Sequence, residues 1–142
     1  MMQRDYILRH IEILGAALIA LRKKILGRDV EPGEVESRLQ EITEKGGMAL
    51  DLARMASPAT LRMLVAPTGE IEPGRCWLLA ESLYLDGLHA HGSGEGWRAR
   101  DSLAKAGMLY SLLKPMGAFL VGFPEALERI REIEALELET EG

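Results

Sequence analysis

The spacing of apolar residues along this chain predicts an all-α fold. Over residues 2–26, apolar side chains recur at alternating steps of four and three, the seam of an amphipathic helix: Ile7, Ile11, Leu14, Leu18, Leu21 and Ile25. Gly27 follows and is expected to end this helix as its C-cap. No segment shows the sustained two-residue alternation of a half-buried strand. We therefore expect six to seven helices, beginning with one long amphipathic helix.

Proline and glycine divide the next part of the chain into short helices. After a linker at 28–33, a second helix is indicated by Val35, Leu39 and Ile42, and it stops at Gly46. A third helix is indicated by Met48, Leu52 and Met55, which are expected to face the core. Ser57 followed by Pro58 is the pattern of an N-cap and first helical residue, and it opens a fourth helix.

Residues 73–139 predict the packed centre of the fold. A fifth helix begins at Pro73 and is apolar on most sides, which is typical of a buried central helix. A glycine-rich turn at 91–96 leads to a sixth helix from Trp97 to Leu113, and Pro124 opens a last one, with Glu128, Arg129, Arg131 and Glu132 outward. The expected core residues are Trp77, Ala80, Leu83, Tyr84, Ala99, Leu103, Ala106, Tyr110, Leu127 and Ile130.

Composition and charge narrow the class of protein. The 142 residues, 47% apolar and 27% charged, are enough for one globular domain spanning 1–142. The net charge of -5 disfavours nucleic acid as a partner. A lone cysteine, Cys76, cannot form an internal disulfide and favours a cytoplasmic location, where we expect it to be a small buried hydrophobe.

The first helix could meet a membrane in only one way. Its apolar run at 13–21 is too short to span a bilayer and is followed by basic residues, so we expect neither a spanning helix nor a signal peptide. Its end carries the one basic cluster of the chain, Arg22, Lys23, Lys24 and Arg28. Contact with a membrane surface is the alternative to a solvated helix end, which we favour because the helix also carries Asp5 and Glu12.

The C-terminal half resembles a single degenerate tetratricopeptide repeat, a helix pair with large residues on its first helix and small ones on its second. The residues that carry the resemblance are Trp77, Ala80 and Tyr84 on the first helix and Ala99, Leu103 and Ala106 on the second. The resemblance implies a helical core at 73–139 that presents a groove to a peptide or protein. The whole chain is also similar to an uncharacterised family of small all-helical bacterial proteins, whose opening pattern matches residues 4–9; this similarity implies no activity.

No catalytic or metal-binding constellation emerges from the sequence. His89 and His91 would point about 200° apart on a helix, whereas metal-binding pairs lie three or four residues apart. Glu81 and Asp86 would lie about 140° apart, so they cannot form one acid–base pair. The loop at 92–96 lacks the preceding strand and the lysine of a phosphate-binding loop. We therefore expect no catalytic residue, no metal and no cofactor.

Two functional hypotheses follow. The favoured one is a non-enzymatic interaction or scaffold protein that contacts a protein partner through its helices. The alternative is a small-molecule-binding or metal-binding protein, or an enzyme, with a polar pocket near the loop at 92–96, formed by Glu81, Asp86, His89, His91 and Arg98.

The first helix, residues 1–27, also predicts self-association. It carries more apolar surface than one small core would hide, so we expect a homodimer or a higher even oligomer. The expected interface consists of Ile7, Leu8, Ile11, Ile13, Leu14, Leu18, Ile19, Leu21, Ile25 and Leu26. The competing account is that the second to fourth helices cover the first helix within one chain.

Overall fold

The computed structural model describes residues 2–114 and 126–141, with side chains placed at 9–114 and 126–137. Within these ranges helices are joined by turns and short irregular segments and there is no strand, so the predicted all-α fold of six to seven helices is confirmed. The elements are α1 (Met2–Leu26), α2 (Glu34–Lys45), α3 (Leu50–Met55), α4 (Pro58–Leu64), α5 (Pro73–Gly92), α6 (Gly96–Leu113) and α7 (Ala126–Glu141). The expectation that Pro124 opens the last helix lies outside the described residues.

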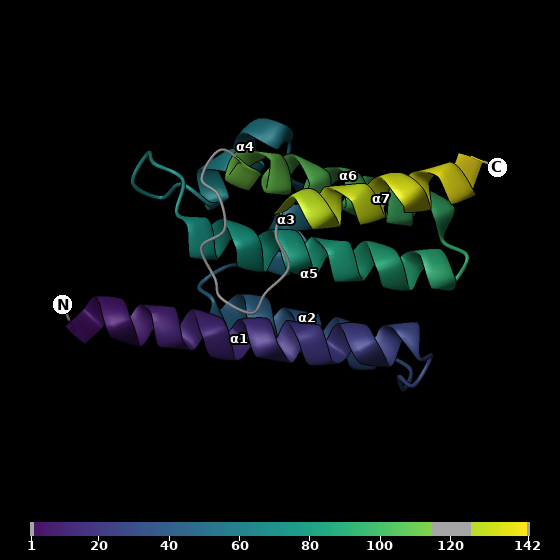
Figure 1. Ribbon diagram of the computed structural model, residues 1–142, viewed down its shortest axis with the longest axis horizontal. Coiled ribbons are helices and arrows are strands. Elements are labelled where there is room, and N and C mark those ends of the chain that lie inside the picture. The colour runs from purple at the N-terminus through teal and green to yellow at the C-terminus, as the bar shows by residue number, and fades with distance from the viewer. Residues whose placement is uncertain (1, 115–125, 142) are drawn as a thin grey trace.

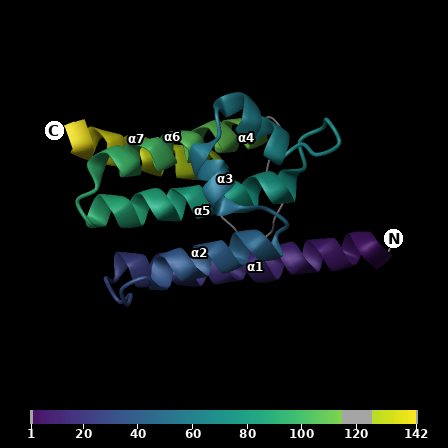
Figure 2. The same cartoon turned by 180° about the vertical axis from the view of Figure 1, so that it is seen from behind.

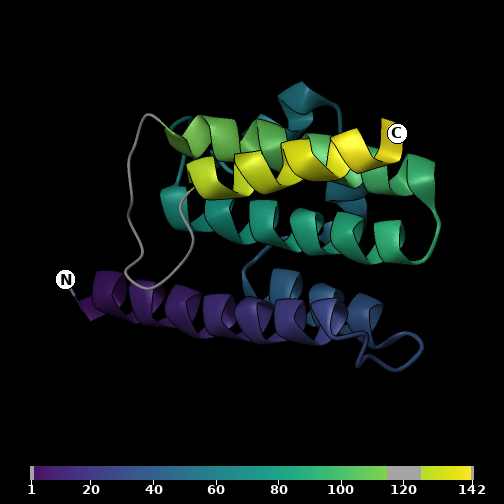
Figure 3. The same cartoon turned by 45° about the vertical axis from the view of Figure 1, so that its right-hand side comes forward.

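The helices are arranged around α5. Figure 1 and Figure 3 show α1 and α2 on one side of α5 and the pair α6 and α7 on the other. Seen from behind in Figure 2, the short helices α3 and α4 lie beside α5 and α6. Contacts between elements agree, because α5 packs against α6, α1, α2 and α3, and α6 packs against α7 and α4. Helices α5, α6 and α7 follow one another in the order that the apolar spacing predicts, whereas both the repeat resemblance and the family stay predictions.

Helix α5 is the buried centre that its sequence predicts. Every residue from Cys76 to Leu88 is buried, including the polar residues Glu81, Ser82 and Asp86. Gly87 lets α6 approach closely, because a Cβ added there would lie 2.7 Å from Leu103 Cγ. The apolar faces of the neighbouring helices therefore meet on this one element.

The end of α1 differs from the expectation by one residue. Gly27 is not the left-handed residue; Arg28 is, with φ 54, and it is the one non-glycine residue with positive φ among those described. The N–H of Arg28 donates to Ile25 O at 3.1 Å and that of Asp29 to Lys24 O at 2.9 Å. This is the hydrogen-bond pattern of a Schellman motif, with arginine where glycine is usual.

Helices α3 and α7 each bury a side other than the one that the sequence predicts. In α3 the buried residues are Leu50 and Ala53, whereas Leu52 and Met55 are exposed. In α7, Leu127 is exposed and Ile130 half-buried, while Arg129, expected to face solvent, is 2% exposed. By contrast, the expected cap of α4 is confirmed, because Ser57 Oγ accepts from the N–H of Thr60 at 3.2 Å.

Candidate functional site

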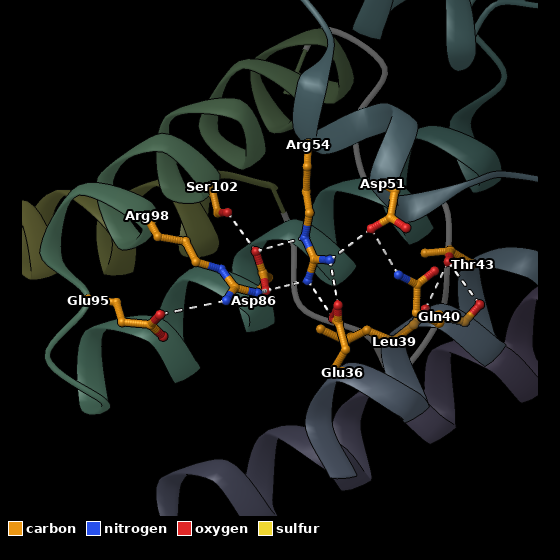
Figure 4. Close-up of polar contacts among 10 residues, drawn as sticks. All are labelled: Glu36, Leu39, Gln40, Thr43, Asp51, Arg54, Asp86, Glu95, Arg98 and Ser102. Carbon is orange, nitrogen blue, oxygen red and sulfur yellow. Dashed lines mark hydrogen bonds and ion pairs between the residues drawn. The ribbon is translucent and has the colours of Figure 1, made fainter. Parts of the chain in front are cut away.

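The candidate site is built next to a buried carboxylate, that of Asp86. Asp86 on α5 is 2% exposed and accepts hydrogen bonds from three side chains that come from two other helices (Figure 4). Arg54 of α3 donates from Nη2 to Oδ1 at 2.8 Å. From α6, Arg98 Nη2 donates to Oδ1 at 2.9 Å and Ser102 Oγ to Oδ2 at 2.7 Å. Burial raises the pKa of the Asp86 carboxyl, but Arg54, Ser102 and Arg98 outweigh it and hold that pKa below its usual value.

Arg54 joins this carboxylate to α2. Its Nη1 and Nη2 donate to the two carboxylate oxygens of Glu36 at 2.7 and 2.6 Å, a bidentate pair. Asp51, one turn earlier on α3, accepts from Nη1 at 3.1 Å. The hydrogen bond to Glu36 is the main cause that lowers the pKa of Glu36 and raises that of Arg54. We define Glu36, Asp51, Arg54, Asp86, Arg98 and Ser102 as the Asp86 network.

The network explains how so short a helix as α3 is held in place. An isolated helix of six residues is unstable in water, because nucleation is unfavourable and few hydrogen bonds follow it. Arg54 ties α3 to α2 and α5, and Lys105 of α6 donates from Nζ to the backbone carbonyl of Arg54. The position of α3 against α6 is therefore fixed by charge-assisted hydrogen bonds.

The space between α3, α4 and α6 is a groove with a volume of about 570 Å³. Its lining is mostly apolar and comprises Arg54, Met55, Ala56, Ser57, Pro58, Leu61, Trp97, Asp101, Ala104, Lys105 and Met108. We call this surface the α3–α6 groove. Met55, on its α3 side, is 82% exposed, and Trp97, on its α6 side, is 75% exposed. A large apolar side chain thus stands uncovered on each side of a hollow.

The contrast between the two tryptophans makes Trp97 distinctive. Trp77 is buried in α5, as predicted, whereas Trp97 lies in the first turn of α6 and is mostly exposed. Tryptophan and methionine are enriched in protein interfaces and are costly to leave in water. Met55 and Trp97 are exposed at the same groove, so they mark it as a candidate binding site for a partner.

A second buried network lies on the other side of α5. Arg129 of α7 donates from Nε to Glu81 Oε1 at 2.5 Å, and the Tyr110 hydroxyl also donates to Glu81. Tyr84 donates to Glu132 Oε2 at 2.9 Å, and its ring lies under the Arg129 guanidinium, 4.9 Å from the centroid. Burial and the Glu132 carboxylate raise the pKa of Tyr84 to about 12. This network holds α7 against α5 and α6.

The predicted polar pocket does not form as one group, although two of its members, Asp86 and Arg98, are brought together. Glu81 and Asp86 belong to the two separate networks, as their spacing on one helix indicates, and Arg98 pairs with Asp86. His89 and His91 lie instead in the last turn of α5 and line another cavity. No group of three His, Cys, Asp or Glu residues suited to a metal ion occurs in the part of the chain that the structure describes.

The predicted dimer interface is divided between the core and the surface. Ile11, Leu14, Leu18, Leu21 and Ile25 are buried in the core of the single chain, where α1 packs against α5 and α2, so they are not open to a second copy. Ile13 and Leu26 are exposed and Ile19 is half-buried. The side chains of Ile7 and Leu8 lie outside the described residues. Of the competing account, in which the second to fourth helices cover the first, the structure bears out only the part of α2; α5, rather than α3 and α4, covers the rest of the described seam.

Two of the four residues of the basic cluster at the end of α1 form ion pairs with other residues of the chain. Arg22 donates to Glu132 Oε1 at 3.2 Å, and Lys24 pairs with Glu34. Among the helices of the described ranges, none combines the length and the apolarity that crossing a bilayer requires.

The sequence pattern does not identify the two residues that mark the groove. It predicts Met55 on the inner side of α3 and Trp97 only as the first residue of a helix. A signal for Trp97 was present, because position 97 lies about 200° around the helix from Ala99, the first residue of the buried seam. No comparable signal marked Met55, because a six-residue helix has too few turns to define its apolar side.

Comparison with known proteins adds no relative to this picture: no family model, no curated protein and no solved structure matches the chain.

Proposed function

We propose that this protein is a non-enzymatic interaction protein that binds an amphipathic helix of a partner protein in the α3–α6 groove. The observation that carries the proposal is the exposure of Met55 and Trp97 on the two sides of an apolar hollow. Burying one such side chain stabilises a complex by about 1.5–3 kcal/mol, so both together offset a large part of the cost of association.

The shape of the groove favours a helix as the bound segment. The α6 residues that line it, Trp97, Asp101, Ala104, Lys105 and Met108, recur at helical spacing and form one side of α6. From Trp97 to Met108 this side extends about 16 Å, at 1.5 Å per residue, which is about three turns. A partner helix with apolar residues three and four apart can lie along such a stripe, in the helix-in-groove mode of recognition.

Charge on the groove indicates what the partner helix carries. The positive side chains of the lining, Arg54 and Lys105, are mostly buried and already paired. Asp101, whose Oδ2 lies 3.1 Å from Lys105 Nζ in one of these pairs, is itself half-exposed and lies between Trp97 and Met108 on α6, so its carboxylate can also be shared with a second cation. We therefore expect a lysine or arginine on the partner helix, between its apolar residues.

The rigidity of the groove wall supports the proposal. Arg54 is tied to Glu36 and Asp86, and its carbonyl accepts from Lys105, so α3 needs no ordering when a partner binds. A preorganised surface avoids part of the entropy cost of association.

The state of the reactive side chains favours a non-enzymatic role. The buried carboxylates Glu81 and Asp86 are each engaged by arginine, and burial raises the pKa of the Cys76 thiol to about 12. None of these three groups presents a base or a nucleophile to solvent.

Affinity capture from extracts of the source organism, with three matched baits, tests the proposal. The wild type and Met63→Glu should retain the same partner, because Met63 on α4 is 71% exposed but does not line the groove. Trp97→Glu should lose it while keeping the wild-type helical signal. The captured partner must then bind the pure protein directly, through a single amphipathic helix supplied as a peptide. Equal capture by Trp97→Glu, or a partner lost equally by Met63→Glu, contradicts the assignment to the groove.

The homodimer through α1 stays a prediction. Among the side chains described, the surface left for it consists of Ile13, Ile19 and Leu26. Ile19 and Leu26 are seven residues apart and share a side of the helix, whereas Ile13 lies about 120° from Ile19. Sedimentation velocity of the wild type and of the variant Ile13→Glu with Ile19→Glu tests it. A wild type that is monomeric at micromolar concentration refutes the dimer, and a variant that becomes monomeric but stays helical supports it.

A further inference from the structure

A second cavity lies where the C-terminal ends of α1 and α5 meet, away from the α3–α6 groove. Its volume is about 410 Å³, within the roughly 300–1,000 Å³ that small-molecule sites occupy. The residues that line it come from α1, the α1–α2 connection, α5 with its following turn, and α7: Ile25, Leu26, Arg28, Val30, Leu88, His89, His91, Gly92, Ser93 and Leu136.

The lining combines an apolar surface with basic groups. Ile25, Leu88 and Leu136 are among its apolar residues, whereas the ionisable residues of the lining are Arg28 and two histidines. Among the described residues no aspartate or glutamate lines the cavity, although acidic residues outnumber basic ones in the chain as a whole. This part of the surface is therefore suited to a ligand with an apolar body and a negative charge.

The Arg28 guanidinium is available to such a ligand. The neighbouring cations Arg22 and Lys24 are paired with Glu132 and Glu34. No hydrogen bond or ion pair joins the side chain of Arg28 or of His89 to any residue that the structure describes. Among the basic side chains near the end of α1, Arg28 thus differs in two ways. It lines a cavity, and no described side chain pairs with its guanidinium.

The backbone conformation of Arg28 independently indicates that its side chain has a role. Arg28 has φ 54, the left-handed conformation that glycine adopts readily and a residue with a Cβ adopts at a cost. The Schellman hydrogen bonds of α1 need that conformation but not that side chain. An arginine at a position where glycine would fit the backbone better points to a use for the guanidinium.

We propose that this cavity binds a small amphipathic anion, a free carboxylate on a short aliphatic chain. The guanidinium of Arg28, whose planar donors match the two oxygens of a carboxylate, holds the headgroup, and His89 donates a further hydrogen bond. The aliphatic chain lies against Leu88, Ile25 and Leu136.

Titration of the pure protein with three ligands of equal chain length tests the proposal. Octanoate carries the proposed charge, octanol carries none and octylammonium carries the opposite one. Calorimetry and the amide NMR shifts of residues 25–30 and 88–93 should show saturable octanoate binding, octanol binding at least about tenfold weaker, and no octylammonium binding. Equal binding of octanoate and octanol, or the absence of saturable octanoate binding, overturns the proposal.

Paired variants assign the site. Arg28→Gly removes the guanidinium at a position whose backbone suits glycine, so the variant should unfold at the same or a higher urea concentration than the wild type. Its affinity for octanoate should fall at least about tenfold, as expected for the loss of a charged hydrogen bond. Lys23→Gln removes one exposed positive charge from the last turn of α1, outside the cavity, and should leave the affinity unchanged. An unchanged affinity in Arg28→Gly, or an equal loss in Lys23→Gln, contradicts the assignment.

Discussion

Arg129 of α7 donates a hydrogen bond from Nε to Oε1 of Glu81 on α5 over 2.5 Å, and both side chains are almost completely removed from solvent. This contact determines which face of α7 turns inward. A buried carboxylate without a partner is very unfavourable, so the positive charge faces the core. Leu127, two residues earlier, is then left in solvent.

The first prediction concerns this pair. Arg129→Met leaves the Glu81 carboxylate buried without its cation and should lower the free energy of unfolding by about 3–5 kcal/mol. Glu81→Gln introduced into Arg129→Met removes the unpaired charge and still accepts from Tyr110, so it should recover a large part of the loss. Urea denaturation of both variants measures this. An Arg129→Met protein as stable as the wild type would show that the pair is not formed.

The second prediction is a dependence of stability on pH through Asp86. The net effect of its surroundings is to lower the pKa of this carboxyl, and an unfolded aspartate titrates at about 3.9. The unfolded chain therefore takes up the proton first as the pH falls, and the stabilisation by Asp86, present above that value, is lost as the pH falls through the lower folded pKa.

At pH 7, Asp86→Asn should cost about 1.5–3 kcal/mol, because it removes the charge from hydrogen bonds to two arginines. The difference from the wild type should narrow below about pH 4. Asp29→Asn, at an exposed loop position, is the control for the loss of one negative charge. A gap between wild type and Asp86→Asn that stays constant down to pH 2 contradicts the account.

The third prediction compares two helical glycines. Alanine at Gly87 places a Cβ 2.7 Å from Leu103 Cγ and 3.2 Å from Ala99 O, so α5 and α6 must move apart. Gly87→Ala should cost about 1–3 kcal/mol, as overpacked cores do. A Cβ at Gly107 on α6 meets nothing within 4 Å, so Gly107→Ala should stabilise the helix by about 0.5–1 kcal/mol. Thermal unfolding of the two variants checks both signs, and a stabilising Gly87→Ala would refute the close packing.

The fourth prediction concerns the reactivity of Cys76. The side chain is fully buried, Sγ donates to Leu109 O at 3.3 Å, and burial raises the thiol pKa to about 12. Ellman's reagent attacks through the thiolate, so the native protein should react only as fast as it unfolds. Cys76→Ala with Ser93→Cys, which puts the thiol on the exposed turn after α5, should react at once. Immediate reaction of native wild type would contradict the burial.

The sequence predicts best the features that depend on neighbours along the chain. The seam of α1 from Ile11 to Ile25, the cap at Ser57 and the buried character of α5 follow from spacing and local chemistry, and all three are confirmed. The features it fails to predict depend on distant partners. Arg129 faces inward because of Glu81, 48 positions earlier, and hydropathy alone assigns an arginine to solvent.

The candidate site was harder to predict than the fold. The orientation of α3 is set by Arg54 and its partners on α2 and α5, and the period of a six-residue helix gives no independent indication of it. Met55 is exposed as a consequence. Trp97 could be recognised as lying off the seam of α6, but its neighbour across the groove could not.

Site-specific photocrosslinking tests the proposed groove most directly. Benzoylphenylalanine incorporated at position 97 replaces one large aromatic side chain with another at the edge of the groove, and the same residue at position 63 is the control on an exposed surface outside it. After irradiation in the source organism, the account predicts one dominant adduct from position 97, to another protein and through a helical segment, and none to that protein from position 63. The same adducts from both positions, an adduct only to a second copy of this chain, or no adduct from position 97 would contradict it.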